Sequence, residues 1–385
     1  MAIDKKTINE KLREQKIGTP SWGYGDSGTR FHVAHRASSP RTLEERLEDA
    51  AAVNRFTGVC PFVDLHTAWD KSDDWGRVKR QATDLGLRIG AINPHLFDED
   101  DYVLGSVCNP IERVREKSVG KLLESIEIAK AVGARILSLW FADGTDYPGQ
   151  DSFRARRRRL QDALARVYPA MSDDMCMVIE YKLFEPGFYH MDVADWGGSY
   201  TLCRALGDRA MVLVDLGHHA LGVNIEQIVA LLLSEGKLGG FHFNDKKYGD
   251  DDLTVGAINP YQLFLIFCEL VAAETDPDTR QYSRQVALMI DENHNFKYAI
   301  EGTIQSVVAL QVAYAKALLV DYGYLAEMQG RGEVIRAEEC LKDAFLSDVR
   351  PLLGEVRADM GLDPDPIAAF RKSGYMEKIT RERSP

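Results

Sequence analysis

Strand-like and helix-like segments alternate eight times along this chain, and this pattern restricts the fold more than any other feature. Eight apolar runs are separated by segments with helical spacing. The runs lie at residues 17–25, 59–66, 87–97, 135–144, 177–182, 212–220, 239–245 and 286–295. Eight alternating strands and helices are the number that closes a parallel barrel. We therefore predict an α/β fold, a (β/α)₈ TIM barrel with a C-terminal helical extension.

The helical segments complete this reading. Helical spacing occurs at residues 43–56, 75–85, 110–132, after Gly149, and at 200–206, 224–236 and 261–274. Gly133 is placed as a helix C-cap. We expect residues 1–302 to form the barrel with an N-terminal helical leader. Residues 303–385 should supply the last barrel helix and a helical extension that packs on the outside or on a neighbouring subunit.

Composition excludes several classes of protein. The formal net charge of −12 argues against a nucleic-acid partner, because phosphate binding needs clustered Lys and Arg. One basic run, at residues 154–159, is expected to be a solvated or subunit-facing helix surface. Six scattered cysteines without C-x-x-C spacing indicate reduced thiols. No stretch approaches a membrane span and no apolar leader is seen, so we expect a cytoplasmic protein that does not bind membranes.

Four consecutive runs in the second half of the barrel end in metal-type ligands. These are Glu180, Asp215, His242 and Asp291. Because the carboxyl ends of parallel barrel strands meet at one face, distance along the sequence does not keep these side chains apart. Three carboxylates and one imidazole suit Mn²⁺, Mg²⁺ or Co²⁺ better than a structural Zn²⁺. The pattern predicts a metal site at this face.

A second set of ligands follows closely. His218 lies three residues after Asp215, and Asp250 and Asp252 lie in an acidic loop after residue 245. These three could hold a second cation, and two metals could each bind a substrate oxygen. Alternatively, the two loop aspartates form an exposed acidic turn. Asp245 is expected to have a supporting role.

Other residues point into the same mouth. Lys182 is two residues beyond Glu180 and therefore shares its strand face, where it binds a ligand oxygen or balances the carboxylates. His66 ends the second run and could hydrogen-bond a hydroxyl or move a proton. Trp22, Trp69 and Trp140 follow or end other runs. Aromatic walls beside polar ligands are typical of sugar sites, although each Trp could also be core.

Seven motifs give the chain a family resemblance. They are LHTAWDK, DGTDYPGQ, EYKLFEP, DWGGSY, VDLGHHA, GKLGGFHFNDKKYGDDDL and MIDENHN. With them the chain resembles the bacterial L-rhamnose isomerase family, in the broad-specificity branch that includes enzymes acting on D-allose and D-ribose. The resemblance runs from residue 18 to the C-terminal region. It implies an aldose–ketose isomerase on a xylose-isomerase-like TIM barrel that binds a monosaccharide, uses Mn²⁺ or Co²⁺ and is a homotetramer.

The resemblance also implies roles for single residues. The first four ligands would hold a structural metal, while His218, Asp250 and Asp252 would hold a catalytic one. Lys182 and His66 match positions that contact substrate oxygens. The family's pocket wall is matched by Trp69, Trp140 and Phe97. Phe31 matches an aromatic residue that reaches into the neighbouring subunit's site.

Some features keep the preferred sugar and the mechanism open. Thr67 and Ala68 stand where family members have an apolar residue and Pro, the segment 98–106 is shortened, and His95 replaces an amide-type residue. Hydrogen could move between C1 and C2 as a hydride, or through an enediol with Asp291 or His218 as base. The alternatives in function are a ketose 3-epimerase on the same fold, a metal-dependent endonuclease-like barrel, and a non-catalytic sugar-binding barrel.

Overall fold

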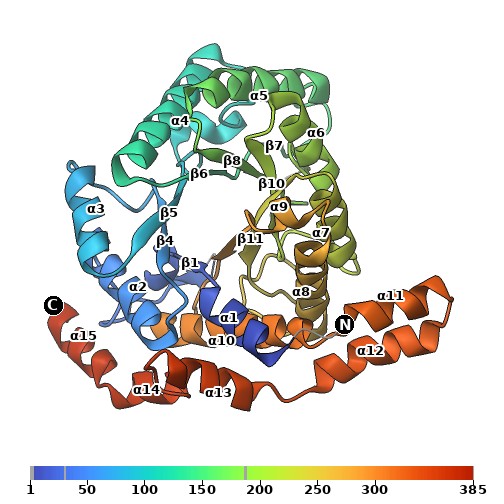
Figure 1. The fold of residues 1–385 in the computed structure, drawn as a ribbon. Coiled ribbons are helices and arrows are strands. Elements are labelled where there is room, and N and C mark those ends of the chain that lie inside the picture. Colours follow the sequence, from blue (N-terminus) through green and yellow to red (C-terminus); the bar gives the residue numbers. More distant parts are fainter. Residues whose placement is uncertain (1–3, 30–31, 186–188, 385) are drawn as a thin grey trace.

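The computed structural model describes residues 4–29, 32–185 and 189–384, and its centre is a closed barrel of eight parallel strands (Figure 1). Around the barrel the strands follow the order β1, β12, β11, β10, β8, β6, β5, β4. Their bounds are β1 Ile17–Pro20, β4 Phe62–His66, β5 Arg88–Asn93, β6 Ile136–Leu139, β8 Cys176–Glu180, β10 Ala210–Asp215, β11 Leu238–Phe243 and β12 Ala287–Ile290. Each predicted run overlaps one of these strands, although β8, β10 and β11 begin one or two residues before their runs. The predicted (β/α)₈ barrel is confirmed.

Several strands end earlier than the apolar runs suggest. The run at 87–97 leaves the barrel after Asn93, because Pro94 has no N–H with which to continue the ladder. The run at 17–25 ends at Pro20, and residues 22–24 form a short 3₁₀ turn, η1. The apolar residues beyond these strand ends, such as Phe97, therefore lie in the loops above the barrel rather than inside it.

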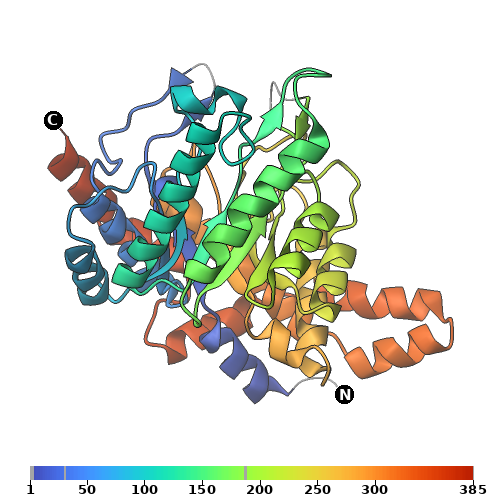
Figure 2. The same cartoon turned by 90° about the horizontal axis from the view of Figure 1, so that it is seen from above.

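Helices cover the outside of the barrel (Figures 1 and 2). They are α2 Leu43–Thr57, α3 Trp75–Asp84, α4 Glu112–Val132, α5 Phe153–Val167, α6 Trp196–Leu206, α7 Ile225–Ser234, α8 Pro260–Thr275 and α10 Ala299–Leu318. Local chemistry sets their ends: the Thr42 hydroxyl accepts the Glu45 N–H at the start of α2. Gly133 ends α4 at φ 80°, a left-handed conformation that glycine adopts without strain, as the sequence predicted.

Short helices and strands precede the barrel or lie in its connections. Helix α1 (Lys5–Glu14) precedes it, and α9 (Arg280–Ser283), η2 (Asp100–Leu104) and η3 (Tyr168–Ala170) lie in connections. Two antiparallel ribbons pair β2 (Gly28–Thr29) with β3 (His32–Val33), and β7 (Gly144–Thr145) with β9 (His190–Met191). These ribbons were not predicted from the sequence, because two-residue strands are too short to show a period.

The C-terminal extension is helical and lies outside the barrel. It comprises α11 Tyr322–Gly330, α12 Val334–Leu346, α13 Arg350–Asp359, α14 Pro366–Lys372 and α15 Tyr375–Arg383. Helices α11 and α12 project as a hairpin, whereas α13 to α15 run back along the barrel (Figure 1). There Phe370 packs edge-on against Phe56 of α2, with ring centroids 5.5 Å apart. The division of the chain at residue 302 stays a prediction, and it falls inside α10.

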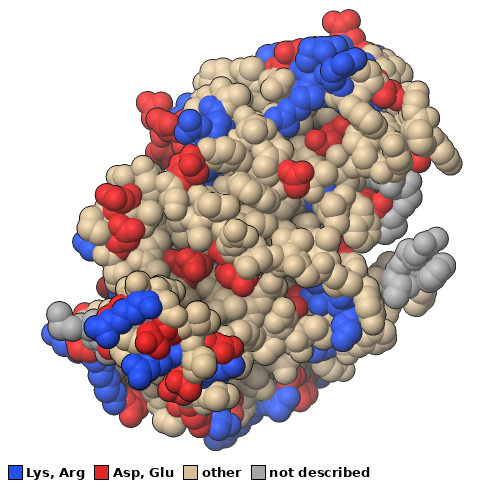
Figure 3. Space-filling view, turned by 90° about the vertical axis from the view of Figure 1, so that its right-hand side faces the viewer, with Lys and Arg blue, Asp and Glu red and all other residues tan. Residues whose placement is uncertain are grey.

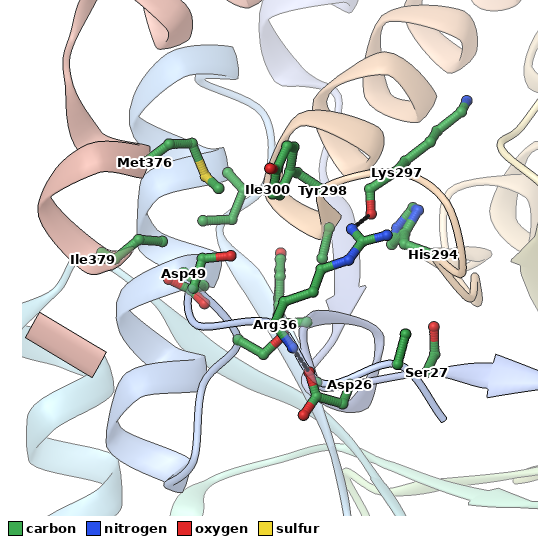
Figure 4. A pocket seen from close by; sticks show the side chains of 16 residues that line it. Asp26, Ser27, Arg36, Asp49, His294, Lys297, Tyr298, Ile300, Met376 and Ile379 are labelled. Carbon is green, nitrogen blue, oxygen red and sulfur yellow. Dashed lines mark hydrogen bonds between the residues drawn. The ribbon is translucent and has the colours of Figure 1, made fainter. Parts of the chain in front are cut away.

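A buried ion pair connects the last helix, α15, to α2. Arg383 of α15 donates to both carboxylate oxygens of Asp49 in α2, at 2.8 and 2.9 Å, and to the Ser38 carbonyl. Burial raises the pKa of the Asp49 carboxyl to about 6, in opposition to the lowering effect of Arg383. Figure 4 shows Asp49 beside Met376 and Ile379 of α15, where these side chains line a cavity of about 20 Å³. This volume suits a single water molecule.

The prediction that the basic run at residues 154–159 is a solvated or subunit-facing surface is wrong for Arg156. Arg156 of α5 is fully buried rather than solvated, and it donates from Nε and Nη2 to the Asp192 carboxylate at 2.8 to 2.9 Å. Arg159 pairs with Asp151 at 2.7 Å. Helical spacing could not reveal this, because the partner at residue 192 is brought near only by the barrel.

The structure also bears on the predictions about the cysteines and about membrane spans. All six cysteines are free thiols. Among the described residues no single helix is both long and apolar enough to cross a membrane, although the bent pair α10 and α11 together meets that test by length and composition. On the face shown in Figure 3, acidic and basic side chains are interspersed.

Replacing Arg383 by Met should destabilise the protein. The substitution leaves the Asp49 carboxylate buried without its counter-ion, so we expect the free energy of unfolding to fall by about 3–5 kcal/mol. Urea unfolding followed by circular dichroism measures this. Arg381→Met, at an exposed position of the same helix, is the control and should change little. Equal unfolding midpoints for the two variants would show that the pair does not hold α15.

Candidate active site

Four of the predicted ligands meet at the carboxyl ends of neighbouring strands. Glu180 ends β8, Asp215 ends β10, His242 is the penultimate residue of β11, and Asp291 follows β12 directly. Asp215 and His242 are register partners in adjacent strands. One ligand atom from each of the four residues lies within 4.8 Å of all the others. We call these four residues the first ligand group.

An imidazole nitrogen stands among the carboxylates of this group. Nδ1 of His242 is 3.2 Å from Glu180 Oε2, 3.5 Å from Asp291 Oδ2 and 3.9 Å from Asp215 Oδ2. This nitrogen is buried and has no hydrogen-bond partner of good geometry among the described residues. Burial lowers the pKa of His242, but the carboxylates outweigh that effect and raise it to about 10. A nitrogen surrounded by anionic oxygens is the environment that a divalent cation would satisfy.

A second ligand group adjoins the first and shares one residue with it. Asp215, His218 and Asp250 each offer an atom within 4.8 Å of the other two. Nε2 of His218 lies 3.3 Å from Asp250 Oδ1 and 3.9 Å from Asp215 Oδ1. From the sequence Asp215 was expected at one site alone, whereas in the structure it can reach both. A shared carboxylate is what brings two cations close together.

The orientation of the His218 ring suits ligation through Nε2. Its Nδ1 lies 3.1 Å from the Tyr181 carbonyl oxygen, which can only accept, so Nδ1 carries the proton. The carboxylates of Asp215, Asp250 and Glu180 outweigh the effect of burial and raise the pKa of His218 well above its ordinary value. To bind a cation the ring would lose a proton, and Nε2 would then present its lone pair on the side of Asp250 and Asp215. Metal-bound histidines commonly donate their other N–H to a carbonyl in this way.

Asp252 does not belong to the second ligand group. Its Oδ2 accepts a hydrogen bond of 2.5 Å from the Asn293 side chain, and its backbone has a positive φ of 45°. Burial, with the neighbouring Asp250 carboxylate, raises the pKa of Asp252 well above its usual range. Spacing and the family resemblance both grouped it with Asp250, whereas in the structure its Oδ2 is hydrogen-bonded to Asn293.

The charge of the two groups fits divalent cations. Four carboxylates, those of Glu180, Asp215, Asp250 and Asp291, gather where two imidazoles must be neutral to ligate. Burial raises the pKa of Asp215 to about 7, against the lowering effect of His218, which shows how unfavourable another negative charge is there. Buried anions without counter-charges are costly. The donor set of oxygen and imidazole suits Mn²⁺, Co²⁺ or Mg²⁺.

Two residues that the sequence analysis did not single out hold the shared aspartate. The Asn244 side-chain amide donates to both oxygens of Asp215, at 3.0 and 3.1 Å, and the Gly217 N–H donates to Oδ1 at 2.7 Å. A Cβ at Gly217 would lie 2.9 Å from Asp250 Oδ1 and 3.2 Å from Asp215 Oδ1. Gly217 lies in the motif VDLGHHA and Asn244 in FHFND. Their closeness in sequence to the predicted ligands is the one feature by which they could have been recognised.

Lys182 lies beside the second ligand group. Its ammonium is 2.7 Å from Asp250 Oδ2, forms an ion pair with Glu185, and stands 5.1 Å from the centre of the Trp140 ring. Burial favours the neutral amine, but the carboxylates of Asp250 and Glu185 raise the pKa of Lys182 above its ordinary value. The lysine is therefore a buried cation at the mouth.

Aromatic rings form a wall opposite these charges. Ring centroids are 4.5 Å apart for His66 and Trp69, 6.0 Å for Trp69 and Phe97, and 5.6 Å for Phe97 and Trp140. Trp69 is 46% exposed, so its face is open to a ligand. Trp22 extends the wall and donates from its indole N–H to Asp291 Oδ1 at 2.9 Å. Phe31 lies outside the described residues.

His66 is held as a hydrogen-bond donor. Its Nδ1 accepts the Ala68 N–H at 3.1 Å, so the neutral ring carries its proton on Nε2. Burial lowers the pKa of His66 to about 3. Of the two roles considered from the sequence, donation to a hydroxyl fits this environment, whereas accepting a proton at neutral pH does not.

A third cluster of acids does not resemble a metal site. Cys108, Asp143 and Asp192 also approach within 4.8 Å of one another. However, the Asp143 carboxylate accepts from the Ser106 N–H and hydroxyl and from the Cys108 N–H. Asp192 is neutralised by Arg156. Each acid of this cluster is already satisfied by the protein.

Replacing Gly217 by Ala should weaken metal binding. The added methyl group would press on Asp215 and Asp250, and disturbing the groups that orient ligands typically costs about 10–100-fold in affinity. Titration calorimetry of EDTA-stripped protein with Mn²⁺ measures this. Gly120→Ala is the matched control, because a Cβ there meets nothing within 4 Å. Unchanged affinity in Gly217→Ala would mean that these carboxylates do not bind the ion.

Comparisons with known proteins agree with this architecture. Residues 47–267 match the family described as xylose isomerase-like TIM barrel. A probable sugar isomerase of Rhizobium meliloti (strain 1021) is 41% identical over 99% of this chain and 89% of its own length, and one of Mesorhizobium japonicum is 42% identical over 100% and 89%. A solved L-ribulose 3-epimerase shares the fold at 18% identity, with a TM-score of 0.57 over 80% of this chain and 98% of its own. The chain therefore belongs to the xylose isomerase-like TIM-barrel family.

Proposed function

We propose that this protein is a metal-dependent aldose–ketose isomerase of the L-rhamnose isomerase type. Its substrate would be a monosaccharide, with L-rhamnose, D-ribose and D-allose as the candidates. The observation that carries the proposal is the pair of ligand groups that share Asp215 beneath an aromatic wall. Two relatives that align with nearly the whole chain are named probable sugar isomerases, which supports the same class of enzyme.

The proposed site holds two divalent cations, with Mn²⁺ preferred over Co²⁺ or Mg²⁺. Glu180, Asp215, His242 and Asp291 would hold one ion. His218, Asp250, Asp252 and the shared Asp215 would hold the other. When bound, the cations supply Lewis acidity to two adjacent sugar oxygens.

The protein side chains then bind and orient the open-chain sugar. The Lys182 ammonium donates to a sugar oxygen from the Asp250 side, and the His66 Nε2–H donates from the aromatic side. Trp69, Phe97 and Trp140 cover the apolar C–H face of the sugar and exclude water from it. Trp22 fixes one oxygen of Asp291, so that this carboxylate keeps a single orientation. His218 and Asp291 remain the candidates for a base, should the reaction pass through an enediol.

We also propose that the enzyme is a homotetramer and that Phe31 reaches the site of a neighbouring subunit. This proposal derives from the resemblance of the sequence to its family. The half-exposed Trp69 supports it, because a wall residue with an open face can accept an aromatic ring from another subunit.

Removal of metal should abolish turnover. We expect EDTA-treated protein to show no isomerisation of L-rhamnose, D-ribose, D-allose or L-lyxose, and Mn²⁺ to restore it on at least one of them. Product analysis by chromatography separates the alternatives, since an isomerase converts aldose to ketose whereas a 3-epimerase converts one ketose to another. Metal-independent turnover, or no turnover on any aldose after Mn²⁺ is added, would refute the proposed function.

Replacing Lys182 by Met should slow catalysis without emptying the site. Loss of a buried cationic donor to a reacting oxygen is expected to lower kcat by about 10²–10³-fold. Steady-state kinetics on the preferred sugar, with metal content measured on the same samples, tests this. Lys247→Met, at an exposed position near the same mouth, serves as control. A normal kcat in Lys182→Met would exclude the lysine from the reaction.

A further inference from the structure

The opposite end of the barrel contains a large cavity that the proposed reaction does not use. Its volume is about 770 Å³, and it is lined by the first residues of several strands, among them Phe62, Ile136, Cys176 and Ala287. These are the amino ends of the strands, whereas both ligand groups stand at or beyond the carboxyl ends. The cavity shares no residue with either ligand group. Figure 1 shows the strands arranged around the barrel axis. The cavity and the ligand groups lie at opposite ends of this axis.

Several lining positions at this end of the barrel are glycines. TIM-barrel interiors are usually filled by layers of bulky branched residues. Here Gly18, Gly90 and Gly239 line the cavity instead. A Cβ at Gly239 would lie 2.5 Å from Met211 Cβ, and one at Gly18 would lie 2.6 Å from Asp64 Oδ2, so the barrel closes around glycine at these positions. Strand residues line the cavity, and its volume is that of an ordinary small-molecule site.

The walls and the rim of the cavity differ in chemistry. Apolar side chains such as Phe62, Ile136 and Met211 are only partly buried, because they face the hollow. At the rim stand Lys16, Arg88 and Arg284, which are exposed. Within the described part of the chain, these three cations have no ion pair or side-chain hydrogen bond.

Other charged groups of the rim are already engaged. Arg209 lies over the Tyr168 ring and donates to the Ser172 carbonyl at 3.0 Å, and Arg135 is 3.8 Å from Asp174. The rim also carries Asp173 and Asp208, which leaves an excess of cations.

A carboxyl group lies among the inner lining residues. Asp64 is 2% exposed, and its Oδ1 accepts the Ala91 N–H at 2.8 Å. Its Oδ2 has no hydrogen-bond partner in the part of the chain that the structure describes. It offers acceptor oxygens inside, while the unpaired cations stand outside. An anion would therefore keep its charged head at the rim and direct its apolar part inward.

We propose that this barrel-end cavity binds a small organic anion with an apolar body, such as a medium-chain carboxylate. The apolar chain would lie among Phe62, Ile136 and Met211, and the carboxylate would meet Lys16, Arg88 and Arg284. The hollow supplies apolar area to bury and the rim supplies counter-charges that otherwise have no partner. This site is independent of the proposed function at the other end of the barrel.

Calorimetric titration of the metal-loaded, full-length protein with decanoate tests the proposal. We expect saturable binding that is unchanged after the metal is stripped with EDTA. The double variant Arg88→Glu with Arg284→Glu should weaken binding by about tenfold or more, since attraction becomes repulsion at the rim. Lys372→Glu with Arg381→Glu makes the same charge change at exposed positions of the C-terminal extension and should bind decanoate as the parent does.

A cavity-filling variant provides a second measurement. Ala287→Phe should remove binding while circular dichroism shows an intact fold. If that variant fails to fold, the surface charge variants still decide the question. Three outcomes would overturn the proposal: no saturable binding of decanoate, equal weakening in both charge variants, or binding that disappears with the metal. The last outcome would place the carboxylate on the ions at the other end.

Discussion

The mutual repulsion of carboxylates at one end of the barrel is the constraint on which the rest of the site depends. Four acids and two imidazoles are brought together by parallel strands that end at a common face. In a buried environment such charges must be balanced by protons, by basic side chains or by metal ions. Lys182 pairs with Asp250, but no lysine or arginine among the described residues pairs with Glu180, Asp215 or Asp291, which face the imidazole of His242. The arrangement is most readily satisfied by divalent cations.

Strands and loops contribute differently to this site. Glu180, Asp215 and His242 are fixed by the barrel ladder, so their separations follow from strand register. His218 and Asp250 come from loops and need additional support. The Tyr181 carbonyl orients one, and Lys182 pairs with the other. Gly217 and Asn244 then hold the shared aspartate between both groups, which explains why residues without ligand chemistry matter there.

The sequence predicted the eight strands and the first ligand group because both depend on short-range patterns. An apolar run that breaks into Glu180, Asp215 or His242 is visible without any structure. The position of Asp252 was not visible, because its carboxylate is directed by a positive-φ turn and by Asn293, 41 residues away. Arg156 was expected at the surface, because nothing in its helix shows that Asp192 lies beside it. The cavity at the amino end is lined by residues of several separate strands and could not be recognised one strand at a time.

The sequence by itself determined the fold class, the succession of strands and helices, and the chemical type of the ligands, because periodicity and residue type are local properties. Only the tertiary structure decided which carboxylate is shared, which imidazole nitrogen is free and which lysine is buried, since these depend on register and on contacts between distant segments. It also decided that the two ends of one barrel differ. One end gathers acids and imidazoles that could hold cations, while the other is hollow and carries three cations that have no partner among the described residues. That contrast arises because closing the barrel places the beginnings and the ends of all eight strands on opposite faces.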